Sequence, residues 1–390
     1  MFSSRLWAKR RKVTVFGATA SIIAVAFGPT ASALDSKSLS SAATITSCSV
    51  PAPTTAAGYQ TLFDIHTAKW SGADNGYSLP LPNGKVLWLF ADTFTGALNP
   101  DGSRAAGAGM INNSAFLQDK GCITPMVGKD ALSNVASLVR PAVADGSRYW
   151  FQNAVMDGGY LRALMSHMKP VDATNYGFQG VDLATFDVSG SVPRLVGVTS
   201  TPASVSTADM PSWGAGMVQD STYTYIFGTA TVSGKWGKAV YLARVPLGKL
   251  VTPTAWRYWN GSSWGTDVTK RVPVISADQT IDNAFSVHRL SNGTFRIVNK
   301  DYSIIGTTIS AYTSKTPVGP WTKSAPIADA PVPATQSGQG VNYLAGEHPE
   351  IKLASGKVLV TSNNNSLNNN DNMVDGHLYG PRFVEVSLTR

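Results

Sequence analysis

One short pattern recurs five times along the chain and limits the folds that it can adopt. Each copy consists of a run of β-branched and aromatic residues, a tight turn and a second such run. The clearest copy runs from Asp74 through the turn Pro82-Asn83-Gly84-Lys85 to Phe90, and Asn-Gly between two such runs is a strong hairpin signal. The turns fall near residues 84, 146, 220, 293 and 356, so the period is about 60–75 residues.

A repeat of this length has room for four short strands and their loops. The copies show no strong helical period, and small sheets repeated around an axis form a β-propeller. We therefore predict an all-β fold, a five-bladed β-propeller, as a single domain. A β-sandwich or jelly roll is the alternative, but it would lack a fivefold repeat and is usually shorter.

The composition agrees with a folded, turn-rich domain. Of the 390 residues, 43% are hydrophobic, 14% are charged, 36 are Gly and 22 are Pro. Disordered chains need low hydrophobicity and high net charge, and coiled coils are enriched in Glu, Lys and Leu. Both classes are excluded.

The first 33 residues have the layout of a signal peptide. Basic residues precede the apolar run Val13–Phe27, and Ala31-Ser32-Ala33 offers a small-residue cleavage site. A membrane anchor is the alternative, but the run is shorter than the roughly 20 residues that span a bilayer. We expect a secreted protein that is cleaved near Ala33 and has no stable membrane anchor.

The rest of the chain divides into a linker and the propeller. Residues 34–58 are rich in Ser, Ala, Thr and Pro and are predicted to be a linker, and residues 59–390 to be the propeller. Five of the 32 basic residues precede residue 35, so the mature chain carries 27 basic and 24 acidic residues. This near-neutral balance gives no electrostatic reason to expect a nucleic-acid partner.

Two cysteines, Cys48 and Cys122, are present. An even pair in a secreted chain predicts one disulfide; two free buried thiols are the alternative. Two cysteines without neighbouring histidines do not make a zinc site, so we expect no metal site.

Two acidic residues flank the first hairpin. If Asn83-Gly84 is a two-residue loop, Asp74 lies opposite Thr93 and Asp92 lies opposite Asn75. The two carboxylates are then diagonal neighbours, which allows an approach to roughly 5 Å, the separation found in retaining glycosidases. The alternative is that each aspartate caps a turn.

Several segments resemble one known family. They are Trp70–Ser78, Gly84–Phe94, Asn112-Asn113-Ser114, Ala255–Trp264, Pro317–Trp321, His348-Pro349-Glu350 and Tyr379–Phe383. In this order they resemble the secreted propellers that include endo-D-arabinanases, over about residues 59–390. The resemblance implies a five-bladed propeller, hydrolysis of furanoside polymers of the actinobacterial cell wall, and two catalytic aspartates, at Asp74 and Asp92.

These observations predict a secreted glycoside hydrolase that cleaves an arabinofuranosyl polysaccharide of the D-arabinan type with retention of configuration. Its partner would be that polysaccharide, and no cofactor is required. One alternative is a glycan-binding propeller without catalytic activity. Another is an L-arabinan or fructan hydrolase of the same architecture.

The roles of individual residues follow from their neighbours. Asp92 comes after the apolar run Leu87–Ala91, which favours its neutral form and an acid/base role. Asp74 stands beside polar residues and is assigned as the nucleophile; the reverse assignment stays open. The residues expected to hold sugar hydroxyls are Asn113, Asp282, His348, Glu350 and Arg382.

Some of these residues have a structural alternative. His348 could satisfy only local hydrogen bonds, and Arg382 could close the ring or pair with Glu350. For the tryptophans Trp256, Trp259 and Trp264, packing between blades is favoured over a sugar-stacking platform. The Asn-rich run 363–372 is predicted to be a loop near the channel mouth.

Overall fold

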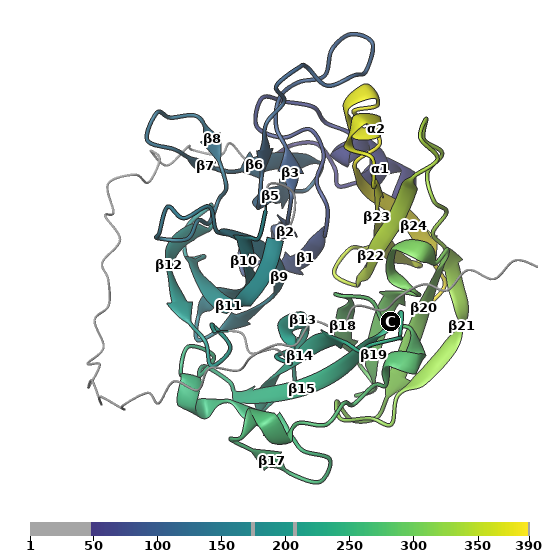
Figure 1. Ribbon diagram of the computed structural model, residues 1–390. Helices are drawn as coiled ribbons and strands as arrows, with labels where there is room; N and C mark the ends of the chain where they lie inside the picture. Colours follow the sequence, from purple (N-terminus) through teal and green to yellow (C-terminus); the bar gives the residue numbers. More distant parts are fainter. Residues whose placement is uncertain (1–47, 173–175, 206–208, 389–390) are drawn as a thin grey trace, which may run out of the picture. The chain divides into compact units, whose positions relative to one another are not determined.

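Antiparallel sheets are the main regular structure in the computed structural model, which describes residues 48–172, 176–205 and 209–388 (Figure 1). The predicted signal peptide and residues 34–47 of the predicted linker lie outside the described residues. Within them, no helix is both long and apolar enough to cross a bilayer.

Five sheets follow one another along the sequence, and each is a blade. Blade 1 contains β1 (Tyr77–Pro80), β2 (Val86–Phe90), β5 (Ser114–Asp119) and β6 (Cys122–Met126). Blade 2 contains β9 (Arg148–Asp157), β10 (Tyr160–Pro170), β11 (Tyr176–Asp187) and β12 (Arg194–Ser200). Blade 3 contains β13 (Ser212–Gln219), β14 (Tyr223–Thr231), β15 (Lys238–Pro246), β16 (Arg257–Trp259) and β17 (Trp264–Gly265). Blade 4 contains β18 (Ser286–Arg289), β19 (Phe295–Lys300), β20 (Thr308–Ser314) and β21 (Thr322–Asp329). Blade 5 contains β22 (Gly340–His348), β23 (Val358–Ser366) and β24 (Gly380–Val386).

The innermost strands of the five blades form a closed ring. Strand β1 contacts β9, β9 contacts β13, β13 contacts β18, β18 contacts β22, and β22 returns to β1. Figure 1 shows the sheets arranged around this ring. The prediction of an all-β, five-bladed propeller is therefore confirmed.

Short elements connect and cover the blades. Two-stranded ribbons are formed by β3 (Thr93–Phe94) with β4 (Met110–Ile111) and by β7 (Gly128–Lys129) with β8 (Val135–Ala136). The helices among the described residues are α1 (Ala56–Phe63), α2 (Asn369–Val374) and the 3-10 turns Pro253–Ala255, Val268–Lys270, Ala277–Gln279 and Ser303–Ile305.

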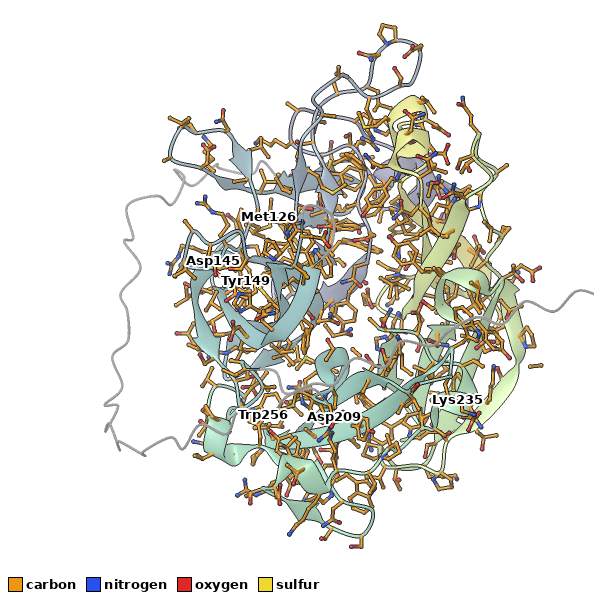
Figure 2. All side chains as sticks on the ribbon, viewed as in Figure 1. Met126, Asp145, Tyr149, Asp209, Lys235 and Trp256 are labelled. Carbon is orange, nitrogen blue, oxygen red and sulfur yellow. A yellow bond between two sulfur atoms is a disulfide. The ribbon has the colours of Figure 1, made fainter. Side chains whose placement is uncertain are left out.

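The hydrophobic core lies between the blades, as a series of separate layers. One layer holds side chains of blades 1 and 2, such as Leu89 and Tyr149. The next joins blades 2 and 3 through residues that include Trp213 and Trp256. Figure 2 shows Tyr149 and Trp256 among these packed side chains. The buried Trp256 confirms the packing role predicted for it, because sheets in a propeller are stabilised face to face.

The predicted repeats match the blades with two shifts. In blade 2, Val139–Val143 is not a strand, since Pro141 has no N–H to donate to a ladder. The inner strand β9 starts after the predicted turn, and its own turn is Gly158-Gly159, where φ is 59° and 82°. In blade 5 the first strand, β22, ends at His348, where the sequence pattern places its start.

Helix α1 joins the two ends of the ring. Its Phe63 ring lies 4.8 Å from Trp88 of blade 1 and 5.3 Å from Phe383 of blade 5. The backbone N–H of Ala56 also donates to Glu385 of β24. The helix starts three residues before Tyr59, the predicted first residue of the propeller; that boundary stays a prediction.

The predicted disulfide is present. Cys48 and Cys122 are bonded, with their Cα atoms 6.0 Å apart. The bond fastens the segment before α1 to the outer strand β6 of blade 1.

Candidate active site

The hairpin β1–β2 places the two candidate catalytic aspartates. Tyr77 pairs with Leu89 and Pro80 pairs with Val86, and the N–H of Leu81 donates to the carbonyl of Lys85. The loop therefore has three residues rather than two. Gly84, with φ at 79°, supplies the left-handed position that such a loop needs.

This one-residue difference changes which residues face each other. Ala73, rather than Asp74, pairs with Thr93. The backbone N–H of Asp74 donates to the carbonyl of Asp92 over 3.2 Å, and the N–H of Ala91 donates to the carbonyl of Asp74 over 3.0 Å. The predicted diagonal placement is corrected to a direct one, in which Asp74 and Asp92 lie opposite each other.

The side chain of Asp74 meets two tyrosine hydroxyls, those of Tyr343 and Tyr379. Tyr343 of β22 donates its hydroxyl to Oδ2 over 2.7 Å, while Oδ1 is buried without a hydrogen-bond partner among the described residues. Burial and the nearby charge of Asp92 raise the pKa of Asp74 to about 7. Asp74 is therefore a carboxyl group that can hold a proton near neutral pH.

Asp92 lies in a more polar environment. Its Oδ1 accepts hydrogen bonds from Asn112 Nδ2 at 3.1 Å and from Trp150 Nε1 at 2.8 Å. Burial raises the pKa of Asp92, but these two donors and the positive charge of Arg148 oppose that shift. Two fixed N–H donors favour the ionised carboxylate.

The hydroxyl of Tyr343 is held in place by a chain of two asparagines. Asn372 donates to Asn365 over 2.9 Å, and Asn365 Nδ2 donates to the Tyr343 hydroxyl over 3.0 Å. Tyr343 then points its proton at Asp74. The run 363–372 is thus not a loop: it forms the end of β23 and most of α2.

A small central space adjoins this region. It is lined by Asn75, which precedes β1, and by inner-strand residues of other blades, which include Asn153, Ser286, Gly346 and His348. Asn75 and Gly76, directly after Asp74, have φ values of 80° and 66°. These left-handed conformations turn the chain at the point where Asp74 meets Asp92.

Asn113 and Asp282 are fully buried, so neither side chain is accessible to a sugar. Asn113 bonds the backbone of Val139 and the carbonyl of Tyr149, next to Trp150. Asp282 accepts from the N–H of Leu344, next to Tyr343. Each therefore fixes the backbone beside a residue that contacts a catalytic candidate, instead of holding sugar hydroxyls.

His348 and Glu350 form a buried group with Ser78. His348 Nδ1 lies 2.5 Å from Ser78 Oγ, and its Nε2 lies 2.8 Å from Thr361 Oγ1. Burial lowers the pKa of His348 to about 3, so the ring is neutral. Ser78 also donates to Glu350. His348 lines the central space but has both nitrogens occupied, which fits the local hydrogen-bonding role.

Among the described residues, Arg382 has backbone carbonyls as hydrogen-bond partners and forms no ion pair with Glu350. It donates to the carbonyls of His377 and Leu378 and lines a hollow beside α1 with Asp64 and His66. The structure thus places it at the ring closure. Trp259 and Trp264 pair with each other on the outer strands of blade 3, with ring centroids 5.4 Å apart.

The sequence patterns do not predict that Asn112, Trp150 and Tyr343 contact the two aspartates. Asn112 is next to Asn113, the residue that the sequence analysis predicts to bind sugar. Which of the two asparagines faces Asp92 depends on how β4 and β5 pair with their neighbouring strands. Tyr343 is 269 positions from Asp74, and no local pattern predicts that contact.

Comparison with solved structures shows the fold. A candidate hydrolase from Bacteroides ovatus ATCC 8483 superposes with a TM-score of 0.69 and 20% identity, over 85% of this chain and 89% of that one. The GH43 β-xylosidase/α-arabinofuranosidase CoXyl43, from a compost metagenome, gives a TM-score of 0.49 and 12% identity over 83% and 93% of the two chains. The α-L-arabinofuranosidase PaAbf62A from Podospora anserina gives 0.46 and 10% over 82% and 92%.

No curated protein matches the sequence. Residues 57–388 match one family along almost the whole described propeller. The chain therefore belongs to the family described as Domain of unknown function (DUF5005).

Proposed function

We propose that the protein is a secreted glycoside hydrolase that cleaves arabinofuranosyl polysaccharide of the D-arabinan type with retention, using Asp74 and Asp92. One observation carries the proposal: two partly exposed carboxyl groups lie opposite each other on one hairpin, in environments that differ. Directly opposite residues of an antiparallel pair have Cβ atoms about 4.5–5.5 Å apart. This spacing suits the two carboxyl groups of a retaining glycosidase.

The environments assign the roles. In a retaining mechanism one carboxylate attacks the anomeric carbon, while the other group protonates the leaving oxygen and later takes a proton from water. Asp74, with its pKa raised to about 7, holds a proton and acts as the acid/base. Asp92, held by Asn112 and Trp150, acts as the nucleophile.

This assignment reverses the one drawn from the sequence. The apolar run before Asp92 was expected to favour its neutral form. In the structure, Leu87–Phe90 are buried in the blade, whereas Asp92 follows the end of β2 and meets polar donors. The run therefore packs within the blade without surrounding the carboxylate.

The substrate class rests on the sequence motifs around both aspartates, which resemble those of secreted arabinanases. The fold shared with the Bacteroides ovatus candidate hydrolase is compatible with a hydrolytic role. Secretion is supported by the signal-peptide pattern of residues 1–33 and by the Cys48–Cys122 disulfide.

The test is a polysaccharide panel, with D-arabinan, L-arabinan and a fructan, and with chromatographic analysis of the products. Wild type should release oligosaccharides from D-arabinan. Asp74→Asn and Asp92→Asn should bind the polymer and release at least about 100-fold less. The matched control is Asp329→Asn, an exposed carboxylate on β21, which should behave as wild type.

Each other outcome rejects part of the proposal. Release of oligosaccharides from L-arabinan or fructan alone would reject the D-arabinan substrate but remain consistent with hydrolysis by the two aspartates. Tight binding of a polymer with no product from any of them would identify a glycan-binding propeller. Full activity of both Asn variants would reject the two aspartates as the catalytic pair.

A further inference from the structure

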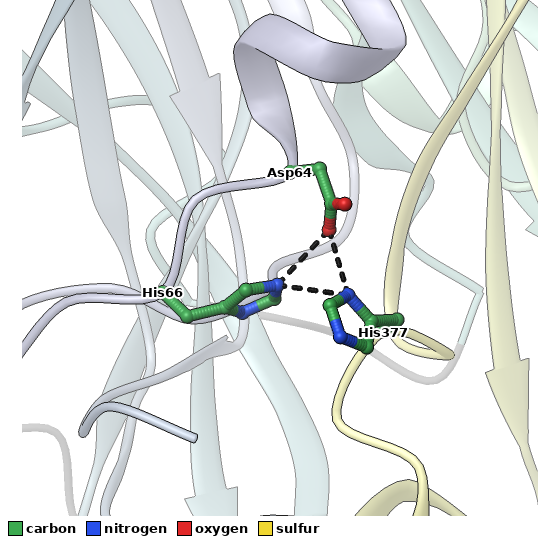
Figure 3. A group of neighbouring side chains, drawn as sticks. All are labelled: Asp64, His66 and His377. Carbon is green, nitrogen blue, oxygen red and sulfur yellow. Dashed lines mark hydrogen bonds and ion pairs between the residues drawn. The ribbon is translucent and has the colours of Figure 1, made fainter. Parts of the chain in front are cut away.

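Three potential metal ligands converge at the ring closure, outside the aspartate pair. Asp64 directly follows α1, His66 is two residues further on, and His377 lies between α2 and β24. Figure 3 shows all three side chains pointing at one another. Segments more than 300 positions apart in the sequence thus meet at a single point.

The three donor atoms form a nearly equilateral triangle. Asp64 Oδ1 is 2.9 Å from His66 Nε2 and 2.9 Å from His377 Nδ1, and the two nitrogens are 3.1 Å apart. For a tetrahedral zinc ion with bonds of about 2.1 Å, the ligand atoms would be about 3.4 Å apart. A small outward movement of each side chain would therefore accommodate one ion.

Hydrogen bonds alone cannot account for all three contacts among Asp64, His66 and His377. Three hydrogen bonds would need three hydrogens, but each of the two nitrogens carries at most one, and the carboxylate oxygen carries none. If both nitrogens donate to Asp64, two N–H groups lie side by side with their nitrogens only 3.1 Å apart and no hydrogen bond between them. If one nitrogen donates to the other, the acceptor nitrogen carries no hydrogen, and it then lies 2.9 Å from a carboxylate oxygen that is also an acceptor. A cation between the three atoms removes this conflict.

We propose that Asp64, His66 and His377 bind one zinc ion. Two imidazole nitrogens and one carboxylate oxygen suit zinc, whereas calcium and magnesium prefer all-oxygen sites. Side chains of Asp64 and His377 are 48% and 51% exposed, so water has access to a fourth position.

A bound ion would link the two ends of the propeller ring. Asp64 and His66 belong to the segment around α1, and His377 leads into the last strand of blade 5. The backbone of His377 is already fixed, since its N–H donates to Asp375 over 3.0 Å and its carbonyl accepts from Arg382 over 2.7 Å. The nearby Arg104 donates to the carbonyls of Asn372 and Gly376. A bound ion would therefore stabilise the ring closure, independently of the proposed hydrolase function.

The experiment uses the mature chain with a cleavable tag that contains no histidine. Zinc content is measured by mass spectrometry after dialysis against zinc sulfate and then metal-free buffer, and thermal unfolding is followed at increasing zinc. Cobalt(II) is the spectroscopic probe, because a tetrahedral site gives visible absorption bands. We expect one zinc per chain and a melting temperature that rises by at least about 2 °C with saturating zinc.

Two variants decide between specific and general binding. His377→Gln and His66→Gln should lose the stoichiometric zinc, the zinc-dependent melting shift and the cobalt bands. His167→Gln, a histidine of β10 far along the chain from these ligands, should keep all three. Zinc below about 0.1 per wild-type chain, or an equal melting shift in all the variants, would overturn the proposal. If a His→Gln variant fails to fold, the zinc content and the cobalt spectrum of the wild-type protein still show whether one tetrahedral metal site is present.

Discussion

The backbone N–H of Asp74 donates to the carbonyl of Asp92 across the first hairpin. The two side chains of this pair meet different partners: tyrosine hydroxyls for Asp74, and an asparagine amide and an indole N–H for Asp92. One hairpin thus supplies both carboxyl groups, while Asn112 of the same blade, Trp150 of blade 2 and Tyr343 of blade 5 supply the groups that separate their proton affinities.

Tyr343→Phe should move the alkaline limb of the pH–activity profile. The Tyr343 hydroxyl stabilises ionised Asp74 and lowers its pKa, so its loss should raise that pKa. The acid/base must be protonated, so kcat/KM falls as pH rises through this pKa. We expect the limb to shift upward by about one pH unit. Tyr302→Phe, at an exposed tyrosine, is the control; an unmoved limb would contradict the role of Tyr343.

Trp150→Phe should instead move the acid limb. The variant keeps an aromatic ring but removes the N–H that bonds Asp92 Oδ1. The pKa of Asp92 should rise, so the ionised nucleophile is lost at a higher pH. We expect an upward shift of about one unit in kcat/KM, with Trp236→Phe, at an exposed tryptophan, as the matched control. If this variant moved the alkaline limb, the two roles would have to be exchanged.

Asp74→Asn should stabilise the protein at alkaline pH. The folded pKa of Asp74 is about 7, above the unfolded value of about 3.9. Between these values the folded state binds the extra proton, so stability falls as pH rises and the penalty is complete above pH 7. Urea unfolding should show a gain on the order of 1–2 kcal/mol at pH 8 that disappears near pH 4. A variant less stable than wild type at pH 8 would show that Asp74 is not strained by its burial.

Replacing both cysteines should destabilise the fold. The Cys48–Cys122 bond joins residues 74 positions apart, and closing a loop of this length in the unfolded chain corresponds to about 4 kcal/mol. Cys48→Ser/Cys122→Ser should therefore lower the free energy of unfolding by about 2–4 kcal/mol in urea titrations. Reduced wild type should behave in the same way, and a loss below about 1 kcal/mol would mean that the bond is dispensable.

The sequence predicted the architecture because each blade repeats its own local signal. Alternating apolar runs and Gly turns recur with each blade, so their count gives the number of sheets without any long-range information. The predicted register of the first hairpin was wrong by one residue. Asn83-Gly84 fits a two-residue loop and the end of a three-residue loop equally well, and only the pairing of Leu81 with Lys85 decides.

The site was predictable only in part. Asp74 and Asp92 share a hairpin, so local pairing brought them together, but their proton affinities depend on Tyr343 and Trp150 from other blades. Polar residues such as Asn113 and Asp282 look like sugar ligands in a sequence; their complete burial is a property of the closed ring. The meeting of His66 with His377, 311 positions apart, likewise has no local signal.

Azide rescue tests the catalytic pair most directly. With an aryl arabinofuranoside that has a good leaving group, Asp74→Ala should regain activity in azide and release a glycosyl azide of retained configuration, because azide attacks the glycosyl-enzyme on Asp92. Asp92→Ala should give the inverted azide, because azide then replaces the missing carboxylate. NMR of the anomeric proton distinguishes the two products. Absence of rescue in both variants, together with undiminished hydrolysis by either one, would contradict the assignment of Asp74 and Asp92.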